Sequence, residues 1–273
     1  MTGAIHALLF PPSCWQCRRT LDASSRGAGD PYLCGPCHGA LGWRDPRACC
    51  ARCGSATASA AAAPEGWASC PACPPGRAAW DRVSAPFAYG EPIRTWLILL
   101  KYHRHDPVAP MLGNLLARAA LRAGALAGVD WVLPVPLHPS RIQGRGFSQS
   151  HLLAHHALAA LRRAGAAVPP LRTDLLSRHK RTRPQVELPP GQRHANVADA
   201  FSVPDPGAGD WLNVLRIGTR DPDPALSARH AIAGRHVLLV DDVMTSGATL
   251  EACARTLRGA GAGRVDALVL ARA

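Results

Sequence analysis

Nine of the ten cysteines in this chain lie between Cys14 and Cys73, and eight of them follow a repeat. Two C-x2-C pairs, at 14/17 and 34/37, recur 36 residues later at 50/53 and 70/73, whereas Cys49 lies outside this register. A C-x2-C turn presents two thiolates to one ion, and two such turns complete the tetrahedral ligand set of zinc. The candidate metal ligands are Cys14, Cys17, Cys34, Cys37, Cys50, Cys53, Cys70 and Cys73.

These metal sites are predicted to be structural, because four thiolates leave no coordination position open for a substrate. The loops between the pairs are rich in Ser, Gly and Ala, so a segment this short needs a metal to be stable. Two zinc ions, a single ion, and reduced cysteines without metal are all compatible with the pattern. The spacing also leaves open which pairs share an ion.

The first ten residues lack the basic start and the small-residue cleavage site of a signal peptide. We therefore expect a cytoplasmic protein, in which disulfides are disfavoured and clustered cysteines bind metal. No window holds 18 consecutive apolar residues, so no membrane span is expected.

The chain of 273 residues is expected to form two domains. Pro74, Pro75 and Gly76 interrupt it after the last repeat cysteine, so residues 1–80 are predicted as a double zinc-ribbon domain and 81–273 as a second domain. With 47% apolar residues the chain can bury a core. Predicted strands at 83–89, 131–135, 237–240 and 265–270 alternate with predicted helices at 93–101, 111–122, 148–164 and 250–258.

This alternation predicts an α/β fold with a doubly wound parallel sheet. Residues 204–230 are rich in Pro and Gly and are expected to be a flexible insertion, with a short strand at 211–217. Cys253 falls in the predicted helix 250–258 and is expected in the core.

A candidate phosphate site lies at residues 237–249, where a buried strand runs into Asp241 and Asp242, then a hydroxyl-rich loop, then a helix. The N-terminus of a helix after a parallel strand presents unpaired N–H groups and a positive dipole end to an anion. Gly247 allows the backbone to approach that anion closely, and paired carboxylates suit sugar hydroxyls. An acidic strand end before an ordinary capped helix explains each feature singly, but the combination predicts a sugar-phosphate site.

Residues 237–249 resemble the signature of type I phosphoribosyltransferases, which bind 5-phosphoribosyl-1-pyrophosphate (PRPP). The resemblance implies that Asp241 and Asp242 hold the ribose hydroxyls and that the following loop wraps the 5-phosphate. The implied PRPP-binding residues of this stretch are Asp241, Asp242, Val243, Met244, Thr245, Ser246, Gly247, Ala248 and Thr249.

Two further motifs resemble the ComF family of phosphoribosyltransferase-like proteins. Residues 133–149 are similar to its "PVPLHP…R…RGFNQ" motif, and Arg183 to Gln185, followed by Arg193, Asn196 and Phe201, to a second block. Ser148 replaces the usual Asn, and Ser246 stands where Thr is frequent. The family also carries an N-terminal tetracysteine zinc module, often doubled, and is associated with DNA uptake during natural transformation.

The resemblance assigns roles to several basic residues. Arg141 and Arg145 would bind the pyrophosphate, and Lys101 matches a Lys that the family often carries. The basic run from Arg178 to Arg183 is otherwise typical of a solvated loop. The resemblance makes this run, together with Gln185 and Arg193, the candidate for a lid that closes over PRPP, with Arg181, Arg183, Gln185 and Arg193 as the lid candidates. Asp241, Asp242 and Arg145 are the predicted catalytic residues.

The predicted function is Mg²⁺-dependent displacement of pyrophosphate from the anomeric carbon of PRPP. Two alternatives remain: a non-catalytic sensor of PRPP or a nucleotide, and a protein that binds single-stranded DNA or DNA-uptake proteins through its zinc ribbons and Arg surface. The net charge of +12 favours an anionic partner, although an Arg-rich chain with only two lysines also reflects coding bias. Neither the acceptor nor the oligomeric state is readable.

Overall fold

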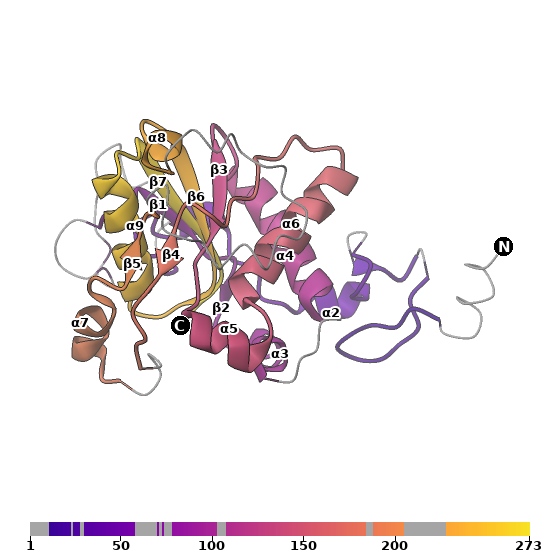
Figure 1. Ribbon diagram of the computed structural model, residues 1–273. Helices are drawn as coiled ribbons and strands as arrows, with labels where there is room; N and C mark the ends of the chain where they lie inside the picture. Colours follow the sequence, from indigo (N-terminus) through magenta and orange to yellow (C-terminus); the bar gives the residue numbers. More distant parts are fainter. Residues whose placement is uncertain are drawn as a thin grey trace.

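The computed structural model describes residues 11–22, 24–27, 30–57, 70, 73, 78–102, 108–183, 188–204 and 228–273. Its centre is a parallel sheet in the order β1-β7-β6-β3, with β2 also paired to β7 (Figure 1). The strands are β1 (Arg82–Ser84), β2 (Phe87–Ala88), β3 (Trp131–Pro134), β6 (His236–Met244) and β7 (Arg264–Arg272).

Helices cover both faces of this sheet, as Figure 1 shows for α9 on one side and α4 and α6 on the other. Val237 and Leu239 of β6 join the core around α9 (Ala248–Gly259). Leu238 and Val240 join the opposite core, which includes α3 (Ile93–Tyr102), α4 (Val108–Ala123) and α6 (Gln149–Arg163). Since neighbouring strand residues point to opposite faces, both sides of β6 are buried. The predicted doubly wound α/β fold is therefore confirmed.

Local differences from the sequence expectations have backbone causes. The strand expected at 83–89 is divided into β1 and β2, because Pro86 has no N–H to donate to a ladder. The segment 138–147 contains α5 (Pro139–Arg145), which His138 caps by accepting from the Ser140 N–H, and which ends at Gly146 with φ of +88°.

The segment between α6 and β6 carries an unforeseen antiparallel pair, β4 (Ser177–Arg178) with β5 (Phe201–Ser202). Between these strands lie η4 (Pro190–Gln192) and α7 (Arg193–Val197), and α8 (Ala228–Ile232) precedes β6. The strand expected at 211–217 and most of the insertion 204–230 lie outside the described residues.

The N-terminal cysteine module contains α2 (Gly35–Gly39) and η2 (Pro46–Ala48) and packs on α4. Asp30 is fully buried at this contact. Its carboxylate accepts a 2.8 Å hydrogen bond from Asn114 Nδ2 and lies 3.6 Å from Arg118 Nε. Leu33 and Cys14 share one hydrophobic core with α4. The first repeat, with the cysteine pairs 14/17 and 34/37, is thus packed against α4, which covers one face of the sheet.

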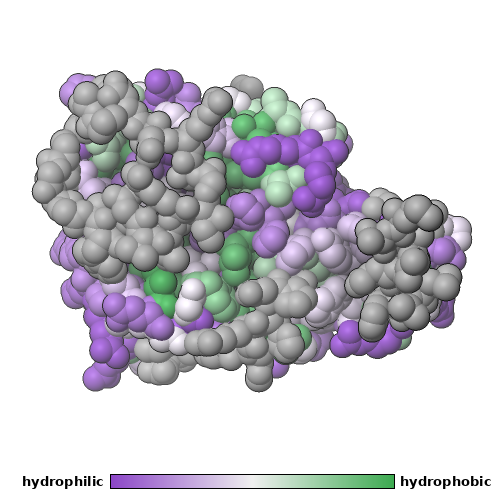
Figure 2. All heavy atoms as spheres, turned by 45° about the vertical axis from the view of Figure 1, so that its right-hand side comes forward, coloured by the Kyte–Doolittle hydropathy of each residue, from purple (hydrophilic) through white to green (hydrophobic). Residues whose placement is uncertain are grey.

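The surface is mixed in polarity. In the view of Figure 2, hydrophobic residues reach the described surface in small areas separated by hydrophilic ones. Among the described residues, every helix is too short or too polar to cross a bilayer.

Candidate functional site

A cleft of about 200 Å³ lies at the carboxyl ends of β3 and β6. This is the end of a parallel sheet at which ligands bind in open α/β folds. The cleft gathers five cationic side chains and two carboxylates. Its lining residues are Tyr89, Lys101, Val135, Pro136, Leu137, Arg141, Arg145, Gln149, Ser150, Arg178, Arg183, Asp241, Asp242, Val243, Thr245 and Thr249.

The two acids occupy positions near the end of β6, and each has specific partners. Asp241 Oδ1 accepts hydrogen bonds from Ser150 Oγ at 2.8 Å and from the Asp242 N–H at 2.9 Å. Asp242 is buried, and its Oδ2 lies 2.6 Å from Lys101 Nζ. Lys101 is therefore placed at the candidate sugar-binding acids, between α3 and the sheet.

The closeness of Asp241, Asp242 and Lys101 shifts the pKa values of Asp241 and Lys101. Burial, followed by the neighbouring Asp242 carboxylate, raises the pKa of Asp241 to about 7, against the lowering effect of the Ser150 hydrogen bond. Burial by itself would lower the pKa of Lys101, but the carboxylates of Asp242 and Asp241 outweigh it and raise that pKa. Lys101 thus keeps its charge beside the pair of acids while Asp241 has a pKa near neutrality.

An Asp241→Asn substitution is expected to stabilise the ligand-free protein at pH 8. The raised pKa means that ionised Asp241 costs stability above about pH 7, whereas the unfolded carboxyl ionises near its usual value of 3.8. The advantage of the variant should therefore shrink as the pH falls from about 7 towards 4. We expect a melting temperature about 2–4 °C higher at pH 8, measured by calorimetry. An unchanged or lower value would contradict the raised pKa.

The loop after β6 leads directly into α9. Gly247 has φ of +81° and stands at the N-cap position of this helix. The left-handed conformation favours glycine, and a Cβ atom at Gly247 would lie 2.9 Å from Met244 Cε and 3.0 Å from Trp80 Cη2, so either side chain would have to move to admit it. Ser246 Oγ accepts a 3.4 Å hydrogen bond from the Ala248 N–H. Thr245 and Thr249 line the cleft, while Met244 is buried beneath the loop.

The two predicted pyrophosphate ligands, Arg141 and Arg145, lie on successive turns of α5 and line the cleft. Arg145 Nη1 donates to Gln149 Oε1 at 2.6 Å, and Arg141 Nη2 donates to the Thr182 carbonyl at 3.0 Å. Both side chains are half-buried, so each is positioned before a ligand arrives.

Arg178 begins the basic run that sequence reasoning interpreted either as a solvated loop or as a lid over the phosphate site. It does not lie on a loop but is buried in β4, with its guanidinium 5.2 Å from the centre of the Phe201 ring. Among the described residues, its Nε has no hydrogen-bond partner. The apolar pair Leu175 and Leu176 just before it was the available signal that this arginine lies on a buried strand.

The four lid candidates have different positions. Arg183 lines the cleft. Arg181 is exposed and is not among the lining residues, and Arg193 Nε donates to the Leu188 carbonyl at 3.2 Å. Gln185 lies outside the described residues.

The cysteines form two clusters, one from each repeat. Cys14, Cys17, Cys34 and Cys37 make the first, and Cys50, Cys53, Cys70 and Cys73 the second, with all ligand atoms in each within 4.8 Å of one another. The Sγ atoms of Cys17 and Cys34 are 3.7 Å apart, and those of Cys50 and Cys73 are 3.6 Å apart. A tetrahedral zinc with 2.3 Å bonds requires about 3.8 Å between sulfurs.

The donor set therefore fits zinc in both clusters. The open question of pairing is also resolved, because ligand pairs combine within a repeat and not across repeats. Cys49 belongs to neither cluster, and Cys253 is fully buried in α9.

Comparisons with known proteins agree with this architecture. Residues 160–273 match the family model described as "Phosphoribosyl transferase domain". The chain is 26% identical to "DNA utilization protein YhgH" of Escherichia coli K12 over 268 residues, which cover 97% of this chain and 99% of the relative. It is 28% identical to the protein of the same name from Salmonella typhimurium over 273 residues. It is also 28% identical to "Competence protein F" of Haemophilus influenzae over 197 residues, 71% of this chain and 74% of the relative.

A parallel sheet with a phosphate-type loop after β6, joined to two tetracysteine clusters, defines a phosphoribosyltransferase-type domain with an N-terminal zinc-ribbon module. Relatives that match nearly end to end carry the names given above. These similarities agree with the resemblance of the chain to the ComF family.

Proposed function

We propose that this chain binds PRPP with Mg²⁺ in the cleft between β3, β6 and α5 and displaces its pyrophosphate. The supporting observation is the cleft itself, in which Asp241 and Asp242 face the same space as Arg141 and Arg145. Five cations against two carboxylates leave an excess of positive charge, which suits a ligand with several phosphate groups. We place this activity in the cytoplasm, where reduced cysteines can hold zinc.

In this proposal the ribose hydroxyls donate to Asp241 and Asp242, and the 5-phosphate binds the start of α9. The N-terminal N–H groups of a 12-residue helix and the hydroxyls of Thr245 and Thr249 supply donors there. Lys101 now pairs with Asp242, so the arriving ribose would share that carboxylate with the ammonium group.

The reaction breaks the bond between the anomeric carbon and the pyrophosphate oxygen, and the electron pair leaves with pyrophosphate. The acceptor's lone pair then forms the new bond to that carbon. Arg145 and Arg141 would stabilise the charge that develops on the leaving group. Mg²⁺ arriving with PRPP would neutralise further phosphate charge. Gln149, which accepts from Arg145, would keep its guanidinium aimed into the cleft.

Binding is tested by thermal unfolding with PRPP and Mg²⁺. At a hundredfold excess over Kd, the melting temperature should rise by about 5–10 °C, because ligand binding to the folded state adds about 2.7 kcal/mol. The double variant Asp241→Asn/Asp242→Asn should show no rise. Asp199→Asn is the matched control, since Asp199 is exposed and outside the cleft. A wild-type protein that does not respond to millimolar PRPP contradicts the proposal.

Turnover and the link to DNA need separate measurements. Pyrophosphate release in the presence of candidate acceptors separates an enzyme from a PRPP or nucleotide sensor.

The names of the relatives refer to DNA utilization and competence, and we extend that association with DNA to this chain as part of the proposal. If the zinc-ribbon residues bind single-stranded DNA, the affinity should fall steeply with salt and disappear when residues 1–80 are removed.

A further inference from the structure

Residues 51 to 54 form a turn of the second cysteine cluster. The four backbone carbonyl groups of this turn each accept a hydrogen bond from a residue outside it. The bonds run from Val83 N to Ala51 O at 2.7 Å, from Trp80 Nε1 to Arg52 O at 2.8 Å, from Arg272 Nε to Cys53 O at 3.0 Å, and from Arg44 Nη1 to Gly54 O at 3.1 Å. Every carbonyl in this turn therefore accepts from a donor that lies outside the turn.

Two of those donors also support the phosphate loop. The buried indole of Trp80 packs directly against Gly247, since a Cβ there would lie 3.0 Å from Cη2. The Nη1 atom of Arg272 donates to the Met244 carbonyl at 3.3 Å. Trp80 thus connects the second cluster to the Gly247 end of the loop between β6 and α9, and Arg272 connects it to the Met244 end.

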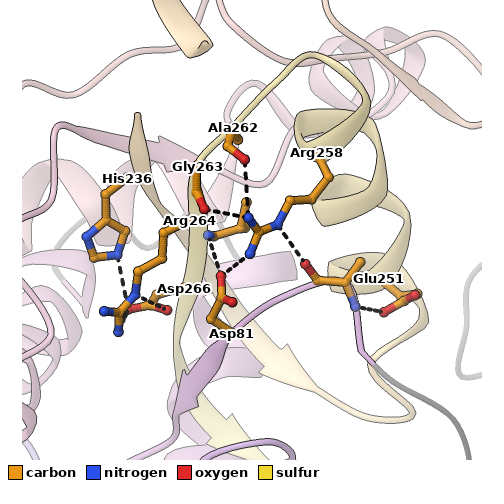
Figure 3. A network of polar contacts seen from close by, with 10 residues as sticks. Asp81, His236, Glu251, Arg258, Ala262, Gly263, Arg264 and Asp266 are labelled. Atoms are coloured by element: carbon orange, nitrogen blue, oxygen red, sulfur yellow. Dashed lines mark hydrogen bonds and ion pairs between the residues drawn. The ribbon is translucent and has the colours of Figure 1, made fainter. Parts of the chain in front are cut away.

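The chain next to Trp80 is fixed to α9 as well. The Ala79 N–H donates to Glu251 Oε2 at 2.9 Å in the first turn of this helix. Figure 3 shows Arg258 of the same helix between Asp81 and the carbonyl of Gly263. Asp81 Oδ2 additionally accepts from the Val265 N–H at 2.9 Å. Trp80 is therefore held between the cluster and the helix that carries the phosphate site.

We infer that the second cysteine cluster, and not the first, holds the phosphate loop in its binding conformation, with Trp80 and Arg272 as the positioning residues. This inference rests on the proposed function only for the identity of the ligand. The first cluster docks on α4 through Asp30 and the core around Leu33, and among the described contacts none connects it to residues 244–249. Metal occupancy of the two clusters should consequently have different effects on the cleft.

A rigid loop binds an anion more tightly, because the ordering has been completed before the ligand arrives. Loss of metal from Cys50, Cys53, Cys70 and Cys73 would release the turn, and with it Trp80 and Arg272. Linkage then requires the reverse effect, so that a ligand in the cleft raises the zinc affinity of the second cluster by the same factor.

The matched variants Cys37→Ser and Cys73→Ser test this inference in the full-length zinc-loaded protein. Both residues are half-buried fourth ligands at equivalent repeat positions. Hydrogen exchange is measured for peptides covering residues 241–254, without PRPP. Cys73→Ser should accelerate exchange there about tenfold, and Cys37→Ser should leave it unchanged. Equal effects of the two variants, or none in Cys73→Ser, would overturn the inference.

A second pair of variants keeps all zinc ligands and serves if Cys73→Ser does not fold. Trp80→Phe keeps a buried aromatic ring but removes both the bond to Arg52 O and the distal indole atoms beside Gly247, and should accelerate exchange in residues 241–254 about fivefold. Trp131→Phe removes an equal 2.8 Å bond, to Ala231 O, and should not. If Trp80→Phe behaves like Trp131→Phe, the positioning role is wrong.

PRPP binding separates this inference from the proposed function. In Cys37→Ser, which retains the second cluster, PRPP with Mg²⁺ should raise the zinc affinity of that cluster, measured by equilibrium competition with a chelator. PRPP that binds without raising this affinity overturns the coupling and leaves the proposed function intact. PRPP that does not bind at all contradicts the proposed function, and the exchange results still decide the role of the cluster.

Discussion

Replacing Cys14 with serine is expected to remove one of two zinc ions and to unfold the first cysteine module, while the parallel sheet stays folded. Cys14 is fully buried, and its Sγ accepts a 3.4 Å hydrogen bond from the Cys34 N–H. Structural zinc contributes about 10–16 kcal/mol in small modules, more than a segment of this size can replace by burial. Native mass spectrometry should show two ions in the wild type and one in the variant.

Limited proteolysis should then cut the Cys14→Ser protein between residues 11 and 41 and leave the α/β domain intact. Cys49→Ser is the control, because Cys49 adjoins Cys50 but belongs to neither cluster. It should retain two ions and the wild-type cleavage pattern. Loss of an ion from Cys49→Ser, or two ions in Cys14→Ser, would show that the ligand sets are wrong.

Replacing Arg178 with alanine is expected to weaken PRPP binding about 100-fold. Arg178 is only 8% exposed and lines the cleft. Burial, and then the like charge of Arg141, lower its pKa, so the guanidinium lacks full neutralisation until an anion binds. Truncating one member of a buried charge pair costs about 2–5 kcal/mol, and 100-fold lies within that range. Isothermal titration with PRPP and Mg²⁺ measures the loss.

Lys180→Ala is the matched control for this substitution. Lys180 belongs to the same basic run, but it is exposed and its Nζ donates to the Ala198 carbonyl at 3.3 Å. Its removal should change affinity less than about twofold, as expected for a solvated charge. Equal losses in Arg178→Ala and Lys180→Ala would mean that general charge, and not the buried position, governs binding.

The candidate site shows which kinds of information a sequence carries. Asp241, Asp242 and the loop to Thr249 were predictable because the strand, the turn and the helix N-terminus follow one another within 13 residues. The metal ligands were predictable for the same reason, since C-x2-C spacing is a local geometric requirement. The placement of Lys101 on Asp242 required two elements separated by about 140 residues to meet, so only family resemblance had suggested a role for it.

Periodicity also has limits where the backbone departs from regular structure. The short helix α5 has too few residues to show a repeat, and it was not among the helices expected from the sequence. Arg178 lies on a two-residue strand, where no alternation can be seen. The burial of that arginine follows from the pairing of β4 with β5, across residues that sequence reasoning treated as a lid.

By itself, the sequence determined the alternation of the main strands and helices, the eight candidate zinc ligands and the phosphate-type loop, because each is encoded by residues close together in the chain. Tertiary structure alone decided that cysteine pairs combine within a repeat, that Arg178 is buried on a paired strand beside the cleft, and that Arg272 joins the carbonyl of Cys53, 219 residues away, to the loop at Met244. These contacts arise from packing of distant segments, which leaves no periodic or local signal in the chain.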